Sequence, residues 1–161
     1  PETLTELLTN YLTEMSKIAI KWGGTIDKFI GDAILVFFGD PVSTGSREDA
    51  VSCASMALEM LAKLEEMRDF WRERGVSQPL NARIGIHTGP IVAGVIGKNK
   101  FAYDLWGATV NMASRMESSG KKNKIQVSED TYNITKGDFD FLKRTSVNIK
   151  GIGLVNTYLI T

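Results

Sequence analysis

Apolar residues recur every three or four positions in two long segments of the chain. In the first, residues 2–22, leucine, tyrosine, methionine and isoleucine fall on one side of a helical wheel. In the second, residues 48–74, apolar residues form one side and charged residues cover the other. The pattern predicts two long amphipathic helices, which end at Gly23-Gly24 and at Gly75.

Between these two helices the pattern changes to that of β-strands. Thr25–Ile30 and the nearly unbroken apolar run Ala33–Phe38 flank Gly31-Asp32, a pair that favours a tight hairpin turn. Such a turn holds the Asp32 carboxylate at the rim of a sheet. Mg²⁺ binds one or two carboxylates together with phosphate oxygens, so Asp32 is a candidate metal ligand as well as a good turn former.

Shorter segments fill the second half of the chain. Helices are predicted over residues 107–119 and 128–134. Strands or short extended segments are predicted over residues 80–88, 91–96, 101–106, 125–127, 139–142, 146–149 and 154–160. Each helix has one face to bury, and an open sheet is the natural surface to receive it. The order therefore predicts an α+β sandwich with a mostly antiparallel sheet, ferredoxin-like if one strand precedes the first helix.

Length and composition fit one domain over residues 1–161 and narrow the classes of function. Lys+Arg and Asp+Glu both number 19, which argues against a general nucleic-acid binder but leaves room for a local phosphate site. The single cysteine, Cys53, excludes an internal disulfide and falls in a helical apolar pattern, as a small buried hydrophobe would. No apolar run approaches the length of a membrane span.

Four separated segments resemble class III nucleotidyl cyclases. Thr25–Asp32 resembles the metal-aspartate hairpin of that family, and Arg83–Pro90 resembles its central strand and turn. Tyr103–Glu117 is similar to the signature segment, and Val147–Gly151 to the last active-site strand. Because the four occur in the family's order, the chain resembles a bacterial-type adenylate cyclase catalytic domain. The resemblance implies the nucleotidyl cyclase fold and conversion of ATP to 3′,5′-cyclic AMP and pyrophosphate.

The resemblance also implies a role for individual residues. Asp32 matches the second of two aspartates that hold two ions, Mg²⁺ or Mn²⁺, at each site. Arg115 matches the arginine that stabilises the transition state, and Asn111, one helical turn earlier, matches the residue that orients the ribose. Lys150 matches the lysine that meets the β- and γ-phosphates. Arg83 is expected to touch the phosphates from the other side.

Hydrogen bonding predicts the choice of base. Adenine offers an acceptor at N1 and a donor at N6, which the donor Lys28 and the acceptor Asp104 complement. Guanine reverses both roles, and guanylate cyclases carry a glutamate in place of the lysine. His87, the only histidine, is expected to be structural, since activation of the hydroxyl by a metal needs no protein base.

One element of the family pattern is missing from these 161 residues. The first metal aspartate of the family lies on a strand ahead of the first helix, so we expect an N-terminally truncated domain. The other determinants share one chain, which favours a homodimer with two equivalent sites. Each site combines Asp32 of one subunit with Lys28, Asp104, Asn111, Arg115 and Lys150 of the other. A regulatory or sensor domain is expected upstream, and the domain is expected to be cytoplasmic even if the parent protein is membrane-anchored. Two alternatives stay open: a guanylate cyclase, and an inactive cyclase-like dimerisation module.

Overall fold

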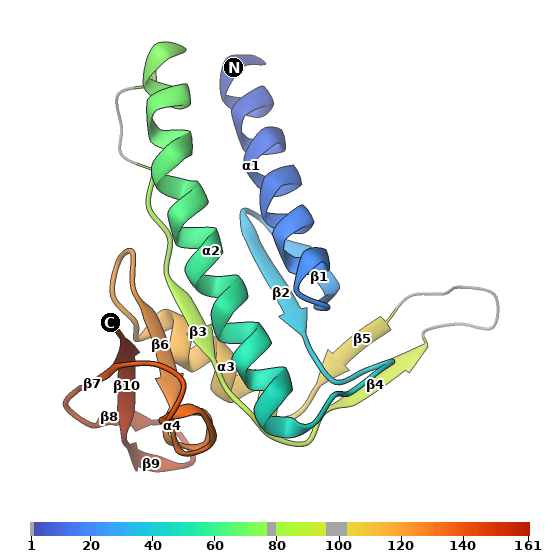
Figure 1. The fold of residues 1–161 in the computed structure, drawn as a ribbon, viewed down its shortest axis with the longest axis vertical. Coiled ribbons are helices and arrows are strands. Elements are labelled where there is room, and N and C mark those ends of the chain that lie inside the picture. The colour runs from blue at the N-terminus through green and yellow to red at the C-terminus, as the bar shows by residue number, and fades with distance from the viewer. Residues whose placement is uncertain (1, 77–79, 96–102) are drawn as a thin grey trace.

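The computed structural model describes residues 2–76, 80–95 and 103–161. Figure 1 shows the arrangement of its helices and strands. The helices are α1 (Glu2–Lys21), α2 (Ser46–Glu73), α3 (Ala108–Ser118) and α4 (Glu129–Thr135). The strands are β1 (Thr25–Ile30), β2 (Ala33–Phe37), β3 (Ile84–Ile86), β4 (Val92–Val95), β5 (Tyr103–Trp106), β6 (Ile125–Ser128), β7 (Phe141–Lys143), β8 (Val147–Ile149), β9 (Gly153–Val155) and β10 (Thr157–Ile160).

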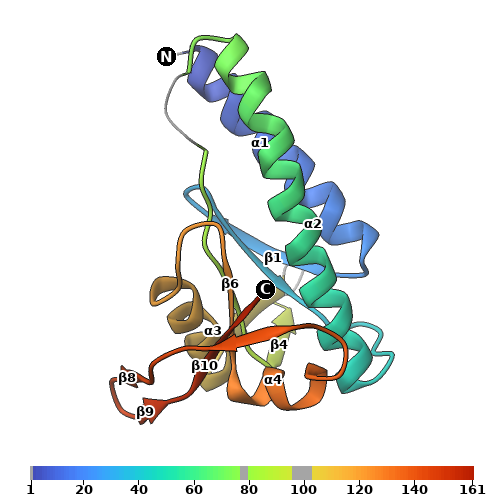
Figure 2. The same cartoon turned by 60° about the vertical axis from the view of Figure 1, so that its left-hand side comes forward.

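Helices α1 and α2 lie side by side and extend beyond the strands (Figures 1 and 2). Their apolar sides meet in a core of Leu7, Met15, Ile18, Ala19, Met56, Met67 and Trp71. Burial of these side chains is the main stabilisation of both helices, since isolated helices are marginal in water. The two predicted amphipathic helices are confirmed, and α2 begins two residues earlier than expected. No described helix combines the length and apolar character needed to cross a membrane.

Strands β1 and β2 form the predicted antiparallel hairpin. Its register runs from Thr25 opposite Phe37 to Ile30 opposite Ala33, so Gly31 and Asp32 make the turn, with φ of 63° at Gly31. That left-handed conformation is one that glycine adopts without steric cost. The register shifts between residues 26 and 28, which marks a β-bulge in the first half of β1, away from the hairpin tip.

The largest sheet has the strand order β3-β6-β10-β7. Strand β3 runs parallel to β6, and the other neighbouring pairs are antiparallel. Its core consists of Ala54, Ala57, Ile86, Ile125, Val127, Tyr158 and Ile160, which joins α2 to the sheet. The ring of Tyr132 on α4 stacks on Tyr158 at a centroid distance of 3.8 Å. These pairings confirm an α+β fold with mostly antiparallel strands.

Two predicted strands are shorter or divided in the structure. Only residues 84–86 of the predicted strand 80–88 form a ladder. The backbone of Ala82 instead bonds to Asn123, whose side-chain oxygen accepts from the Ala82 N–H at 3.1 Å and whose N–H donates to the Ala82 carbonyl at 2.6 Å. The predicted strand 154–160 is divided into β9 and β10 at Asn156, whose amide donates to Glu129 at 2.6 Å. In both places a side-chain amide replaces or interrupts strand pairing.

An open cleft of about 280 Å³ separates β2 from β3. Residues 35–39 line one side and residues 86–89 the other, with Asp49, Ala50 and Cys53 of α2 also in the lining. Among the described strands, β2 pairs only with β1 and β3 only with β6. Both strands therefore present an unpaired edge at this cleft.

Burial raises the pKa of the Cys53 thiol to about 12, which agrees with its prediction as a small hydrophobe.

The backbones of β3 and α3 touch at Gly85. A Cβ atom built on Gly85 would lie 2.1 Å from the Glu117 nitrogen and 2.5 Å from the Met116 carbonyl carbon. Both of those atoms belong to the helix backbone, which a side-chain rotation cannot move. The absence of a side chain at Gly85 therefore lets the last turn of α3 rest directly on the sheet.

His87 belongs to a small hydrogen-bonded cluster where β3 ends. Its Nδ1 lies 2.7 Å from the Ser128 hydroxyl, and the Thr88 and Thr131 hydroxyls lie 2.8 Å apart. Burial lowers the pKa of His87 below 6.5, and the nearby Asp130 carboxylate partly opposes this shift. These contacts join β3 to β6 and α4, which is the structural role expected of the histidine.

Replacing Gly85 by alanine is expected to destabilise the domain by about 1–3 kcal/mol or more, because the added methyl group overlaps the α3 backbone. The free energy of unfolding in urea measures the effect. Gly137→Ala is the matched control, since no heavy atom lies within 4 Å of a Cβ built there and its φ is not in the left-handed region. A loss no larger for Gly85→Ala than for the control would contradict the close contact.

Stability is expected to fall on acidification because His87 resists protonation in the fold. Its folded-state pKa is lowered, so the unfolded chain binds more protons between that pKa and 6.5, and stability rises with pH across this window. We therefore compare the urea midpoint at pH 7.5 and pH 5.5 for the parent and for His87→Gln. The urea midpoint of His87→Gln should fall less between pH 7.5 and pH 5.5 than that of the parent. An identical pH dependence in both proteins would show that His87 does not titrate in this way.

Candidate active site

An open groove of about 680 Å³ lies between α3 and the turn that follows β8. Asn111 and Arg115 line it from α3, and Lys150 lines it from the turn. Figure 2 shows α3 and the β8–β9 hairpin on the same side of the molecule. The structure thus brings together three predicted site residues from two segments that are far apart in the sequence.

Local structure sets the direction of these three side chains. Asn111 and Arg115 are four residues apart, so they lie on the same side of α3 one turn from each other, and both are exposed. The helix begins after Gly107, whose φ of 112° is accessible to glycine. Lys150 is exposed and follows the buried Ile149, which anchors the turn in the protein interior.

The groove carries more positive than negative charge. Neither Arg115 nor Lys150 forms an ion pair with a carboxylate in the described part of the chain. Glu117 also lines the groove, but its carboxylate lies 2.9 Å from Nε of Arg83. The arginine compensates the glutamate, and two cations are left to bind an anion. A guanidinium beside an ammonium is a suitable set of donors for a polyphosphate.

Arg83 was expected to contact phosphates, and the structure gives it a different neighbour. It lies just before β3, is half exposed, and does not line the groove. Its described contact is the ion pair with Glu117 on α3. Within one chain Arg83 thus compensates the charge of Glu117, and its contact with phosphates stays a prediction.

The hairpin residues Lys28 and Asp32 do not line the groove either. Asp32 is exposed at the β1–β2 turn, and its charge adds to burial in raising the pKa of Tyr11 on α1. The bulge in β1 brings the fully buried Asp27 carboxylate within 3.6 Å of the Lys28 ammonium. Asp104 lies on β5 opposite Gly94, and its side chain is outside the described part of the structure.

The described residues contain no group of three or more His, Cys, Asp or Glu side chains that could hold a metal alone. Asp32 provides one accessible carboxylate on a rigid hairpin. Since Mg²⁺ commonly binds one or two carboxylates and completes its shell with phosphates and water, Asp32 fits as a partial ligand set that needs a phosphate substrate.

Sequence reasoning did not identify Gln126 and Arg144, which lie beneath the last turn of α3. Gln126 is completely buried in the middle of β6, and Arg144 hydrogen-bonds to its side chain. A polar residue between Ile125 and Val127, both apolar and buried, was the one signal available in the sequence. The partners of such a residue depend on tertiary contacts that a pattern does not reveal.

Comparison with known proteins agrees with this geometry. The whole chain, residues 1–161, matches the family of adenylate and guanylate cyclase catalytic domains. It is 35% identical over 160 residues to an adenylate cyclase of Mycobacterium tuberculosis, covering 99% of this chain and 34% of that protein. It is 36% identical to guanylate cyclase 32E of Drosophila melanogaster, covering 100% of this chain and 14% of that protein.

A solved structure gives the same result at the level of the fold. The adenylyl cyclase CyaB from P. aeruginosa superposes with a TM-score of 0.94 at 41% sequence identity, covering 100% of this chain and 83% of that one. The chain spans about a third of the length of the mycobacterial relative. Its α+β fold is that of the nucleotidyl cyclases. The chain belongs to the family of adenylate and guanylate cyclase catalytic domains.

Proposed function

We propose that this chain is the catalytic domain of an adenylate cyclase, which converts ATP to 3′,5′-cyclic AMP and pyrophosphate. The observation that carries the proposal is the groove that gathers Asn111, Arg115 and Lys150, with both cations unpaired in the described structure. An inactive module would have no need of two unpaired cations at one groove. The mycobacterial relative and the P. aeruginosa structure, both named as adenylate or adenylyl cyclases, add support.

The proposed reaction is an attack by the ribose 3′-hydroxyl on the α-phosphorus. A bond forms between O3′ and phosphorus, the hydroxyl proton is released to water, and the bond from phosphorus to the oxygen bridging the β-phosphate breaks, which frees pyrophosphate. Arg115 donates two N–H groups to the α-phosphate oxygens, where negative charge develops. Asn111, one turn earlier on α3, holds the ribose by its amide, and Lys150 balances the charge of the leaving pyrophosphate.

Asp32 is the proposed ligand for divalent ions, two Mg²⁺ or Mn²⁺ per site in the family pattern. When bound, such ions lower the pKa of the attacking hydroxyl and compensate phosphate charge. The other expected aspartate lies on a strand ahead of α1. We place that strand in the cleft between β2 and β3, because each presents an unpaired edge there.

The active unit is proposed to be a homodimer with two equivalent sites. The hairpin with Asp32 lies outside the groove of its own chain, so a second chain is needed to bring the two sets together. Apolar side chains are exposed on the hairpin and at the groove: Phe29 and Ile30 precede the turn that carries Asp32, and Ile152 lines the groove. Exposed apolar surface of this kind is typical of a subunit interface.

The whole protein is proposed to be longer than the catalytic domain, with a regulatory or sensor domain upstream. The mycobacterial relative is about three times as long as the aligned segment. ATP is an intracellular nucleotide, so we place the catalytic domain in the cytoplasm.

Lys28 and Asp104 are the proposed readers of the base. A guanylate cyclase is the second candidate, because a relative named as a guanylate cyclase is equally similar in sequence.

Mixing two inactive variants tests the composite site. In the full-length protein, Asp32→Ala and Arg115→Ala are each expected to lower kcat at least ~10²-fold with Mg²⁺, because each removes charge compensation at the reacting phosphate. Random mixing of the two chains should restore about a quarter of the parent activity, because half of the dimers are mixed and each of these has one intact site. Mixed dimers can be isolated by two affinity tags. If they are no more active than either variant alone, sites shared between subunits are contradicted.

Exchange of the base readers tests the choice of nucleotide. Lys28→Glu with Asp104→Cys is expected to raise the ratio of kcat/KM for GTP over ATP by at least ~10-fold, since each reversed contact is worth about 1–3 kcal/mol. Both proteins are assayed at equal Mn²⁺. Lys136→Glu, which repeats the lysine-to-glutamate exchange at an exposed position after α4, is the control and should leave the ratio unchanged.

Three outcomes of the nucleotide assay are informative. A parent protein that prefers GTP would replace the adenylate assignment by the guanylate one. No turnover of either nucleotide by the folded full-length dimer would favour the inactive module. An unchanged ratio in the folded double variant would show that Lys28 and Asp104 do not read the base.

A further inference from the structure

Gln126 holds the last turn of α3 through its side-chain amide. Its Nε2 donates to the Met116 carbonyl at 2.9 Å and lies 2.8 Å from the Ser119 hydroxyl. The side chain is 0% exposed, so these bonds form away from water. The last carbonyls of a helix have no partner within the helix. Gln126 therefore supplies a donor to the end of the helix that carries Arg115.

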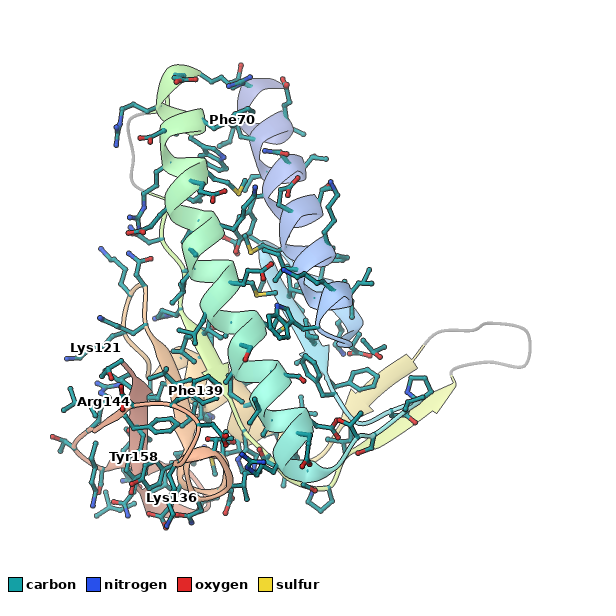
Figure 3. The ribbon with its side chains drawn as sticks, in the orientation of Figure 1. Phe70, Lys121, Lys136, Phe139, Arg144 and Tyr158 are labelled. Carbon is teal, nitrogen blue, oxygen red and sulfur yellow. The ribbon has the colours of Figure 1, made fainter. Side chains whose placement is uncertain are left out.

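Arg144 completes the same network from another strand. Its Nη1 donates to the Ser119 carbonyl at 2.8 Å and also to Oε1 of Gln126. Its own backbone N–H donates to the Thr157 carbonyl on β10 at 2.9 Å, which fixes the position of the arginine. A cation at the C-terminal end of a helix also interacts favourably with the helix dipole. Figure 3 shows Arg144 on the same side of the molecule as Lys121, which follows α3.

The sheet provides a platform for these contacts. Gln126 on β6 is the register partner of Gly85 on β3, so the two residues lie side by side under α3. Gly85 permits the helix backbone to touch the sheet, and Gln126 hydrogen-bonds to the same turn. The backbone contact at Gly85 and the hydrogen bonds from Gln126 together fix the distance of α3 from the sheet and the position of its last turn.

The network connects the last turn of α3, which forms one wall of the groove, to the start of the segment that leads to the other wall. On one side, the Arg115 carbonyl accepts from the Ser119 N–H at 2.9 Å and from its hydroxyl at 2.6 Å. On the other side, the chain runs from Arg144 into β8 and reaches Lys150 directly after that strand. We propose that Gln126 and Arg144 are positioning residues that set the spacing between Arg115 and Lys150. The proposal rests on the proposed function of the groove.

A change in this spacing would affect chemistry more than stability. Arg115 and Lys150 act on different phosphates of one substrate, so their separation has to match the length of the triphosphate. Displacement of a catalytic group by about 1 Å can lower a rate about 10²-fold. Mutation of a residue that only stabilised the fold would lower the amount of folded enzyme without changing the position of Arg115 relative to Lys150.

The test uses Arg144→Met in the full-length protein, which keeps an unbranched side chain and removes the donors. We expect at least a tenfold loss of kcat and a severalfold rise in KM for ATP. The loss of kcat should shrink to less than threefold in an Arg115→Ala background, because no guanidinium remains there to be positioned. The rise in KM should similarly disappear in a Lys150→Ala background.

Arg47→Met is the matched control. Arg47 also makes two hydrogen bonds, both to Asp138, joining α2 to the segment after α4 without lining the groove. It should leave kcat and KM within twofold of the parent. Gln126→Glu is a second variant if Arg144→Met fails to fold. It keeps the acceptor for Arg144 but replaces the donating amide, and it should give the same pattern.

Four results are decisive. The background-dependent losses described above, with Arg144→Lys recovering part of the rate, would support the proposal. Equal losses in every background would overturn it, because they indicate a purely structural role. If Arg115→Ala is inactive while Arg144→Met and Gln126→Glu are both fully active, this inference is overturned and the proposed function of the groove is not. Arg115→Ala with unchanged turnover would mean that the proposed function of the groove has failed, and the inference falls with it.

Discussion

The direct contact between the backbones of β3 and α3 is the constraint on which the groove depends. At Gly85 no side chain separates the strand from Met116 and Glu117, so the helix sits at the shortest distance that its own backbone permits. Protein interiors are close-packed, and a helix seated on a strand in this way cannot move toward the sheet. This contact therefore sets the distance from the sheet of every side chain on the outer side of α3, including Arg115.

Charge compensation explains how a chain with no net charge can offer a site for a polyphosphate. Lysine plus arginine and aspartate plus glutamate are equal in number, yet their local pairing is uneven. Glu117 lines the groove but is matched by Arg83 on the adjoining strand end, whereas Arg115 and Lys150 lack such a partner among the described residues. Arg83 thus contributes to an anion site that it does not line, which a count of charges cannot reveal.

The sequence predicted the elements well and the contacts between them poorly. The helices α1 and α2 and the β1–β2 hairpin followed from periodicity and one Gly-Asp turn, because each is specified by local residues. Resemblance to a family placed Asn111, Arg115 and Lys150 in one site, and the groove contains all three. The ion pair of Arg83 with Glu117 was not foreseen and Gln126 was not singled out, since both depend on how β3, β6 and α3 pack.

Separation of the carboxylate from the cations within one chain has a simple electrostatic reason. An aspartate in the groove would pair with Arg115 or Lys150, as Glu117 pairs with Arg83, and the neutralised cations would attract phosphate less strongly. With Asp32 on a hairpin outside the groove, both cations stay available to the substrate. In the proposed dimer, Asp32 of the second chain would hold the ion that meets the same phosphates. The metal-binding and phosphate-binding charges therefore interact through the substrate instead of cancelling each other.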